Sequence, residues 1–277
     1  MDEAAQESGP GPTAGSSPSL APISAPGSPS GSSGIASPEV SVVVPFWNER
    51  LNVLPLARQV FAAFSEPPRD IELLLVDDAS TDGTWEQILE ARRLDRRVRP
   101  LRLLQHSGQS AALWTGFNAS RAQVIATLDG DLQNDPADLP RLLAQLTTCD
   151  MVCGVRLRRM DSALRRFSTW IARAARKLIL QSDFRDTGCN LRVFKRSLVP
   201  KLLPFDGLHR FMPILAQDAG AVVLETPVAH HARTAGRSKY GVWNRLGRGA
   251  LDLAMLAWYR RRRLPQTPVS EPAPDRP

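Results

Sequence analysis

The sequence is poor in cysteine and in aromatic residues. Its three cysteines, Cys149, Cys153 and Cys189, are odd in number and lack the paired spacing of a zinc site, which argues against a disulfide framework or a structural metal. A reducing compartment fits them best. Aromatic residues make up only 6% of the chain and no DNA- or RNA-binding signature occurs, so we expect no nucleic-acid partner.

Long apolar runs are also missing. None approaches the roughly 18 residues that a membrane-spanning helix needs, and the nearest, Ala250 to Trp258, is interrupted by Asp252. The chain begins Met1-Asp2-Glu3, without the basic-then-apolar pattern of a signal peptide. We therefore expect no export, and we expect any contact with a membrane to be peripheral.

Charge is distributed unevenly along the chain. Residues 1 to 150 carry 11 Lys and Arg against 19 Asp and Glu, whereas residues 151 to 263 carry 23 against 7. An acidic half suits a bound cation, and a basic half suits phosphate groups.

Composition separates two tails from a folded body. Residues 1–38 and 265–277 are rich in Ser, Pro, Gly and Ala and are predicted to be disordered, because they contain too few large apolar residues to offset the entropy of ordering. The body divides into a main domain at 39–240 and a basic amphipathic helix at 241–264.

Short apolar runs rich in β-formers alternate with segments that have the helical spacing of apolar residues. This alternation predicts an α/β fold, with a doubly wound, mostly parallel sheet flanked by helices on both faces. Strands are predicted at Val40–Phe46, Ile71–Val76, Leu101–Leu104, Val124–Leu128, Met151–Val155, Leu191–Phe194 and Ala221–Pro227, and helices at Asn52–Phe64, Thr84–Leu94 and Gln109–Ala119.

Polar residues follow the first four predicted strands. In an open parallel sheet, ligands bind beyond the carboxyl ends of the strands, so these residues should meet at one edge. They are Pro45-Phe46-Trp47-Asn48-Glu49 after the first strand, Asp77-Asp78 after the second, His106 after the third and Asp129-Gly130-Asp131 after the fourth.

Asp129 and Asp131 stand one residue apart, so in strand geometry their charges repel unless a cation joins them. Oxygen ligands from Asp131 and the amide of Gln133, completed by diphosphate oxygens and water, suit Mg²⁺ or Mn²⁺. Because the dinucleotide fingerprint and the phosphate-loop lysine motif are absent, metal and side chains must hold the phosphate. The alternative for a single acid after a strand is a helix cap, and Asp82 fits it.

Five motifs carry a resemblance to a known family. Together they resemble the inverting GT-A glycosyltransferases of family 2, and specifically the sugar transferases that act on polyprenol phosphates such as dolichol and undecaprenol phosphate. The resemblance covers nearly all of the folded body and implies a GT-A catalytic domain at 39–240. The motifs are VVVPFWNE at 42–49, VDDASTDGT at 76–84, LDGDLQNDP at 128–136, DTGCNLR at 186–192 and RTAGRSKY at 233–240.

The resemblance also implies roles for individual residues. Pro45, Trp47, Glu49 and Asp78 would bind the nucleotide base and ribose, with Asp77 nearby, and Asp129, beside Gly130, would contact the ribose or the sugar. Asp131 and Gln133 would bind the metal, and Arg156, Arg233 and Lys239 would face the diphosphate or the acceptor phosphate.

The expected reaction is transfer of a sugar from a UDP- or GDP-sugar to a polyprenyl phosphate. A phosphate acceptor is already ionised, so a strong base is not obligatory. If the acceptor is instead a sugar hydroxyl of a cell-envelope glycan, Asp186 is the first candidate base, although a turn or cap role suits it equally. Histidines at 209, 230 and 231 are alternatives as metal ligands or as hydrogen-bonded structural residues.

Two further functions are weighed against the transferase. A phosphatase that used Asp129 and Asp131 would want a Ser or Thr just beyond its acid pair, where this chain has Leu132 and Gln133. A non-catalytic nucleotide-sugar sensor would have lost its metal ligands, and here Asp129, Asp131 and Gln133 are all present.

Two segments combine basic residues with aromatic or aliphatic ones, as helices at an anionic lipid surface do. They are Leu164–Leu180 and Leu251–Leu264, and the alternative for the first is an ordinary helix packed on the sheet. Many members of the family continue into transmembrane helices, whereas this sequence stops at Pro277. We therefore expect a cytoplasmic protein that associates peripherally with the inner membrane, or that does so through a membrane-protein partner.

Overall fold

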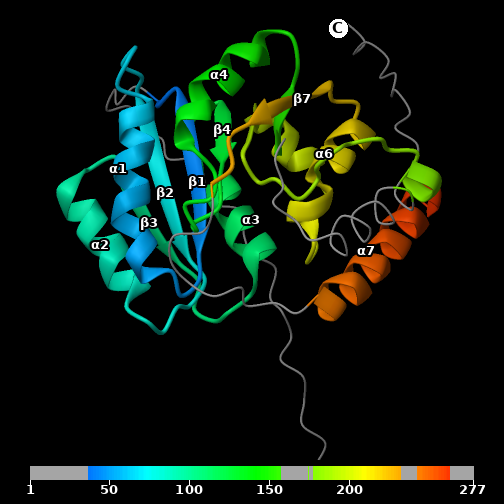
Figure 1. Ribbon diagram of the computed structural model, residues 1–277, viewed down its shortest axis with the longest axis horizontal. Coiled ribbons are helices and arrows are strands. Elements are labelled where there is room, and N and C mark those ends of the chain that lie inside the picture. Colours follow the sequence, from blue (N-terminus) through cyan, green and yellow to red (C-terminus); the bar gives the residue numbers. More distant parts are fainter. Residues whose placement is uncertain (1–36, 157–173, 175–176, 232–241, 263–277) are drawn as a thin grey trace, which may run out of the picture. The chain divides into compact units, whose positions relative to one another are not determined.

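The computed structural model describes residues 37–156, 174, 177–231 and 242–262 (Figure 1). The residues described from Ser37 onward belong to one compact unit. Its strands are β1 (Val40–Phe46), β2 (Ile71–Asp77), β3 (Val98–Arg102), β4 (Val124–Thr127), β5 (Met151–Arg156), β6 (Arg192–Lys195) and β7 (Val223–Val228), and its α-helices are α1 (Val53–Ala63), α2 (Thr84–Leu94), α3 (Gln109–Ala119), α4 (Leu139–Ala144), α6 (Leu208–Asp218) and α7 (Val242–Arg262).

The strands form a seven-stranded sheet in the order β3-β2-β1-β4-β6-β5-β7. The pairs β3–β2, β2–β1, β1–β4 and β5–β7 are parallel, so the predicted mostly parallel sheet is confirmed. Strand β6 runs antiparallel to both of its neighbours. Because β6 starts at the edge where β4 and β5 end, it brings the segment just before it, which includes Asn190, to the same edge as the ends of β1, β2 and β4.

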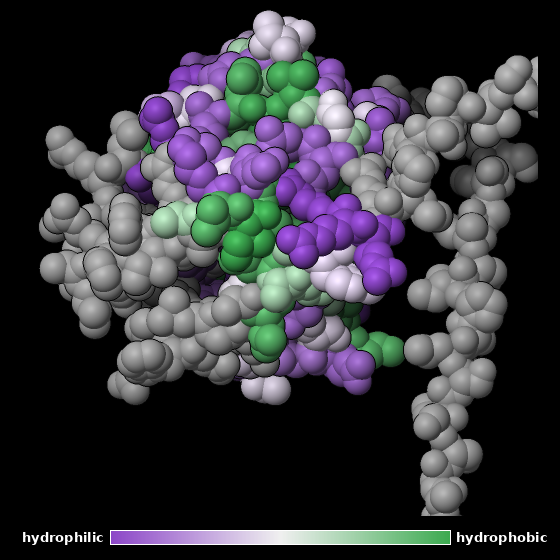
Figure 2. Space-filling view, turned by 90° about the vertical axis from the view of Figure 1, so that its right-hand side faces the viewer, coloured by the Kyte–Doolittle hydropathy of each residue, from purple (hydrophilic) through white to green (hydrophobic). Residues whose placement is uncertain are grey.

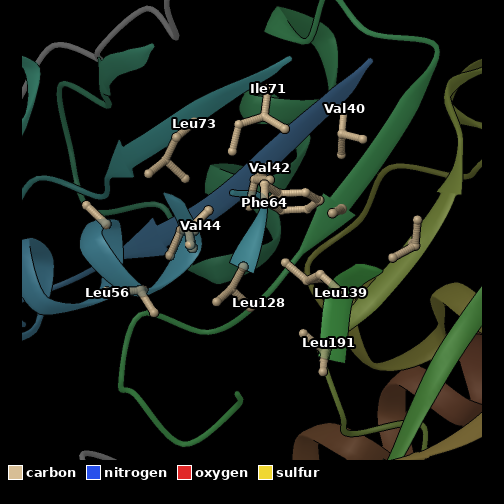
Figure 3. Close-up of a cluster of buried hydrophobic side chains, with 14 of the residues drawn as sticks. Val40, Val42, Val44, Leu56, Phe64, Ile71, Leu73, Leu128, Leu139 and Leu191 are labelled. Atoms are coloured by element: carbon tan, nitrogen blue, oxygen red, sulfur yellow. The ribbon is translucent and has the colours of Figure 1, made fainter. Parts of the chain in front are cut away.

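Side chains of the central strands alternate between two hydrophobic layers. Val42 and Val44 of β1 pack with α1 residues such as Leu56 on one face (Figure 3), whereas Val43 joins the layer formed with α3, α6 and α7 on the other. Burying one such aliphatic side chain contributes roughly 1.5–3 kcal/mol, so both faces of the sheet stabilise it.

Helix α3 approaches β1 unusually closely at Gly116. A Cβ atom at this position would lie 2.3 Å from Cγ1 of Val43, closer than packed atoms come. The contact therefore requires a residue without a side chain.

Several element limits agree with the predictions and others do not. Strand β1 and helices α2 and α3 have the predicted limits, whereas the prediction for β3 is wrong, because this strand begins at Val98 and ends at Arg102. Leu104, expected inside it, is fully exposed, and the register with β2 begins at Val98. The short helix α4 and the helix α6 were not predicted.

In the part of the chain that the structure describes, no helix combines the length and the apolarity that crossing a bilayer demands.

Candidate active site

Polar residues of four strands gather at the carboxyl edge of the sheet. The parallel register pairs Phe46 with Asp77 and Asp77 with Arg102, so the ends of β1, β2 and β3 are level. The expectation that these polar segments meet at one edge is therefore met.

Loops after β1 and β2 are joined by reciprocal hydrogen bonds. The Asn48 amide donates to Ser80 Oγ at 2.9 Å, and the Thr81 amide donates to Asn48 Oδ1 at 2.8 Å, with Asn48 in the left-handed region at a φ of 51°. Next to it, Glu49 accepts a hydrogen bond of 2.7 Å from Asn52 Nδ2. Of the predicted donor-binding residues, Pro45 thus lies in β1, and Trp47 and Glu49 lie in a well-anchored loop directly after it.

Asp78 is buried and binds the loop that follows β3. Its carboxylate accepts hydrogen bonds from the amides of Ser107 (2.7 Å) and Gly108 (2.9 Å), and Oδ2 lies 2.8 Å from Nδ1 of His106. The His106 ring stacks on Trp47 with centroids 4.1 Å apart and an angle of 17° between the rings. Asp78 therefore orients two rings at the carboxyl edge, in addition to the donor contact predicted for it.

Asp77, also buried, shapes the turn after β2. Its Oδ1 accepts a hydrogen bond of 3.1 Å from the Ser80 amide. Its Oδ2 lies 3.1 Å from Nε of Arg102 without the alignment of a hydrogen bond, so that contact is an ion pair. Asp77 thus stabilises the turn after β2, and a nucleotide contact near it stays a prediction.

Asp129 is held from two sides by amide groups. Its Oδ1 accepts hydrogen bonds from Gln109 Nε2 at 2.7 Å and from Asn190 Nδ2 at 2.8 Å. Burial raises the pKa of Asp129 and the charge of Asp131 raises it further, whereas the bond from Asn190 and the charge of Arg156 lower it. The two carboxylates thus interact as the sequence predicted.

The glycine between the two acids permits a close approach of two strand ends. A Cβ atom on Gly130 would lie 2.7 Å from Cδ1 of Phe46 and 2.8 Å from the Pro45 carbonyl oxygen. Gly130 therefore keeps the acid pair directly beside the end of β1.

The loop after Asp131 is fastened to the end of β7. Asp131 Oδ1 accepts a hydrogen bond of 3.2 Å from the Gln133 amide, and the Gln133 carbonyl accepts one of 2.9 Å from the His231 amide. The His231 ring lies 3.3 Å from Asp135. The predicted phosphate-facing residues Arg233 and Lys239 come shortly after His231 in sequence and lie outside the described residues.

Arg156 and Asp186 form a bidentate ion pair. Nε and Nη2 of Arg156 donate to the carboxylate at 2.7 and 2.8 Å. Although burial alone would lower it, the hydrogen bonds and charge of Asp186 raise the pKa of Arg156 above its ordinary value, so the guanidinium stays charged. Glu225 accepts the amide of Arg185 at 2.7 Å and that of Asp186 at 3.2 Å, which fixes the turn.

Sequence reasoning placed His106 at this edge without giving it a role, and it missed Gln109 and Asn190. Asn190 lies inside a motif that the sequence singled out, and His106 follows a predicted strand, so both had a signal. Gln109 had none, because its contact with Asp129 depends on where α3 begins in space.

The residues present fit a divalent cation only in part. In the described ranges no group of three or more His, Cys, Asp and Glu side chains could bind a metal alone. Asp131 and Asp129 nevertheless offer carboxylate oxygens beside each other, and the buried Asn190 Oδ1 next to them has no hydrogen-bond partner. Such oxygen donors suit Mg²⁺ or Mn²⁺ whose remaining ligands come from a substrate. His209, an alternative ligand, instead contacts Ser110 at 2.7 Å.

A mostly parallel sheet with an acid pair at its carboxyl edge is the arrangement expected of a GT-A glycosyltransferase. Residues 41–203 match glycosyl transferase family 2, and the chain belongs to this family.

Named relatives confirm the resemblance to polyprenol-phosphate sugar transferases. Dodecaprenyl-phosphate galacturonate synthase of Rhizobium johnstonii is 38% identical over 238 residues, which cover 82% of this chain and 69% of the relative. Undecaprenyl-phosphate 4-deoxy-4-formamido-L-arabinose transferase of Pseudomonas fluorescens is 37% identical over 203 residues, which cover 73% of this chain and 60% of the relative. The chain thus spans about three fifths of the second relative's length.

Solved structures share the fold. Glucosyl-3-phosphoglycerate synthase from Mycobacterium tuberculosis, solved with Mn²⁺, UDP and glucosyl-3-phosphoglycerate, aligns with a TM-score of 0.60 and 18% identity over 83% of this chain and 82% of that one. Mannosyl-3-phosphoglycerate synthase from Rubrobacter xylanophilus aligns with a TM-score of 0.64 and 15% identity over 86% and 79%.

Proposed function

We propose that the protein transfers a sugar from a nucleotide diphosphate donor to a polyprenyl phosphate, with inversion at the anomeric carbon. The observation that carries the proposal is the acid pair Asp129 and Asp131 beside the charged Arg156 at the carboxyl edge of the sheet. The names of the two relatives, both of which specify a polyprenyl phosphate, support the acceptor.

The donor nucleoside would lie on the loops after β1 and β2. Pro45, Trp47 and Glu49 would contact the base and ribose, and the ring of Trp47, already stacked on His106, offers an aromatic surface to a base. Asp78 would also contact the base and ribose, with Asp77 nearby, and Asp129 would reach the ribose or sugar.

Asp131 and Gln133 would hold Mg²⁺ or Mn²⁺ against the donor diphosphate. The Gln133 Nε2 donates to the His231 carbonyl at 3.4 Å, so its Oε1 is the atom left to act as a ligand. A divalent ion there supplies positive charge to the leaving diphosphate.

In the proposed reaction an oxygen of the acceptor phosphate attacks the anomeric carbon of the sugar. The bond from that carbon to the diphosphate oxygen breaks, and its electron pair leaves with the nucleoside diphosphate. Arg156, oriented by Asp186, would stabilise the growing negative charge, and Arg233 and Lys239 would face the phosphates. Because the acceptor phosphate is ionised at neutral pH, we assign Asp186 the role of holding Arg156 rather than that of a base.

The proposed site of action is the cytoplasmic face of the inner membrane, and helix α7 supports the contact with a membrane surface. Leu251 and Trp258 are 72% and 63% exposed, Leu256 on the opposite side of the helix is buried, and Arg261 and Arg262 follow. Figure 2, which faces the side that carries α7 in Figure 1, shows hydrophobic residues gathered among hydrophilic ones. Apolar side chains beside arginines suit an anionic bilayer.

Vesicle co-sedimentation tests the membrane contact. Vesicles with phosphatidylglycerol should retain the protein, and Trp258→Glu with Leu251→Asp should abolish retention. Leu94→Asp is the matched control, since Leu94 is also exposed (62%) but ends α2. Equal retention of all three proteins would exclude this surface, and no retention of the wild type would favour attachment through a membrane-protein partner.

Donor calorimetry and product analysis test the reaction. With Mn²⁺ and a panel of UDP- and GDP-sugars, we expect one donor to bind and its sugar to pass to a polyprenyl phosphate. Asp131→Asn should lower the rate by at least about 100-fold, the scale on which one electrostatic partner of a transition state acts. Asp70→Asn, an exposed acid before β2 at the opposite edge of the sheet, should leave it unchanged.

Acid lability distinguishes the acceptors. A polyprenyl phosphosugar is cleaved by mild acid, so an acid-stable product would favour transfer to a glycan hydroxyl. Absence of metal-dependent binding to any donor would contradict the proposal.

A further inference from the structure

Three consecutive residues at the start of α3 connect three parts of the fold. The Gly108 amide donates to Asp78 at 2.9 Å, and Gln109 Nε2 donates to Asp129 at 2.7 Å. The third, Ser110, is buried, and its Oγ accepts a hydrogen bond of 3.0 Å from the Gly207 amide and lies 2.7 Å from Nδ1 of His209. The first turn of α3 thus joins the end of β2, the acid pair and the start of α6.

The direction of the Ser110–His209 hydrogen bond follows from its neighbours. A hydroxyl has one proton and two lone pairs, and the amides of Gly207 and His209 donate to Ser110 Oγ at 3.0 and 3.5 Å, so its proton is given to His209 Nδ1. The imidazole must then be neutral, with its own proton on Nε2. Burial, followed by the charges of Arg210 and Arg192, lowers the pKa of His209 to about 3, which agrees with a neutral acceptor ring.

The turn that Ser110 holds has little freedom of its own. Gly207 has a φ of 120°, where residues with a side chain are strained. A Cβ there would also lie 2.8 Å from Oδ2 of Asp252 on α7 and 2.9 Å from Cε2 of Phe205. The start of α6 is therefore a rigid support against which the first turn of α3 can be fixed.

We propose that Ser110 and His209 are a positioning pair, which fixes the first turn of α3 so that Gln109 holds Asp129 in the orientation that the donor sugar and the metal on the neighbouring Asp131 require. The inference rests on the proposed function. Neither residue touches substrate, because both act through Gln109, whose amide reaches the carboxylate. Loss of the pair should therefore raise the concentrations of metal and donor that the enzyme needs and leave its KM for the acceptor unchanged.

The test is steady-state transfer by the full chain at varied Mn²⁺, donor and acceptor concentrations. Ser110→Ala and His209→Leu should each raise the half-saturating Mn²⁺ concentration and the donor KM by about tenfold, with the acceptor KM unchanged. His209→Asn, whose Oδ1 takes the place of Nδ1 as acceptor, should restore both values to within about twofold of the wild type.

Two further variants separate positioning from general damage. Gln109→Ala should reproduce the effect, and the double variant Ser110→Ala with Gln109→Ala should be no worse than the poorer single one, because both act on one contact. Ser120→Ala is the matched control, since it removes a buried hydroxyl that donates to the Gly116 carbonyl at 2.8 Å, at the other end of α3. It should lower thermal stability and leave the Mn²⁺ dependence unchanged.

Either of two results would overturn the positioning role: multiplied losses in the double variant, or a Mn²⁺ shift in Ser120→Ala as large as in Ser110→Ala. Should Ser110→Ala not fold, the pair His209→Leu and His209→Asn gives the same comparison. Calorimetry of wild-type protein with Mn²⁺ and UDP or GDP separates this failure from failure of the proposed function. No binding by the wild type refutes the function, whereas equal binding by wild type and variants refutes only the positioning pair.

Discussion

Replacing Asp186 by Asn separates two roles for this carboxylate, orientation of Arg156 and proton abstraction. In the wild type, Nε and Nη2 of Arg156 donate to the two carboxylate oxygens of Asp186 at 2.7 and 2.8 Å. Asn keeps one of these oxygens and replaces the other by an NH₂ group, which cannot accept a hydrogen bond from the guanidinium. One charge-assisted hydrogen bond contributes roughly 1.5–3 kcal/mol, which corresponds to about 10- to 150-fold in rate. If Asp186 only orients Arg156, kcat/KM should fall within that range.

A double-variant cycle sharpens the prediction. Arg156→Lys cannot make two parallel bonds, so it should lose a similar factor, and the combination with Asp186→Asn should be no worse than the poorer single variant. A general base would instead contribute about 10²- to 10⁴-fold independently of Arg156.

The assay measures kcat/KM for polyprenyl phosphate at saturating donor from about pH 6 to 9. This range reports the titration of a catalytic base whether its pKa is acidic or near neutral. Asp183→Asn is the control, because Asp183 forms a more exposed ion pair with Lys177 at 3.1 Å, and such pairs contribute about 0–1 kcal/mol. A loss beyond about 1000-fold in Asp186→Asn, or losses that multiply in the double variant, would refute the orientation role and restore Asp186 as the base.

Three further predictions concern stability and thiol chemistry. Gly116→Ala should destabilise the protein by about 1–3 kcal/mol in denaturant titrations, because the new Cβ would collide with Val43. Gly249→Ala should instead stabilise it by about 0.5–1 kcal/mol, because Gly249 lies within α7 and a Cβ there would meet no other atom. Burial raises the pKa of Cys153 to about 12, so iodoacetamide at about pH 8 should modify it only after unfolding. The pKa of His209 is depressed from 6.5 to about 3, so the unfolded chain binds more protons. The neutral His209 ring therefore contributes its full share of the free energy of unfolding above about pH 6.5, and this contribution is lost as the pH falls toward 3. His209→Asn should flatten that part of the plot of stability against pH.

Local patterns were sufficient where an element and its neighbours are close in sequence. The limits of β1, α2 and α3 followed from apolar runs and spacing, and the carboxyl edge followed from the rule that parallel strands end together. The motifs after β1, β2 and β4 placed the chain in its family, which the comparison confirmed. Asp131 and Gln133 as metal ligands, and the roles of Arg233 and Lys239, stay predictions.

Contacts between distant segments were decided only by the tertiary structure. The sequence does not encode locally that β6 reverses direction, and this reversal carries Asn190 to Asp129 across 61 positions. From the sequence alone, Arg156 and Asp186 likewise had separate roles, although their side chains form one bidentate pair across 30 positions. Periodicity reports which face of an element is buried, whereas the partner that a polar side chain meets depends on strand order, register and the approach of helices. For that reason the sequence determined the fold class and the chemistry of the edge, and only the folded chain decided which groups hold one another there.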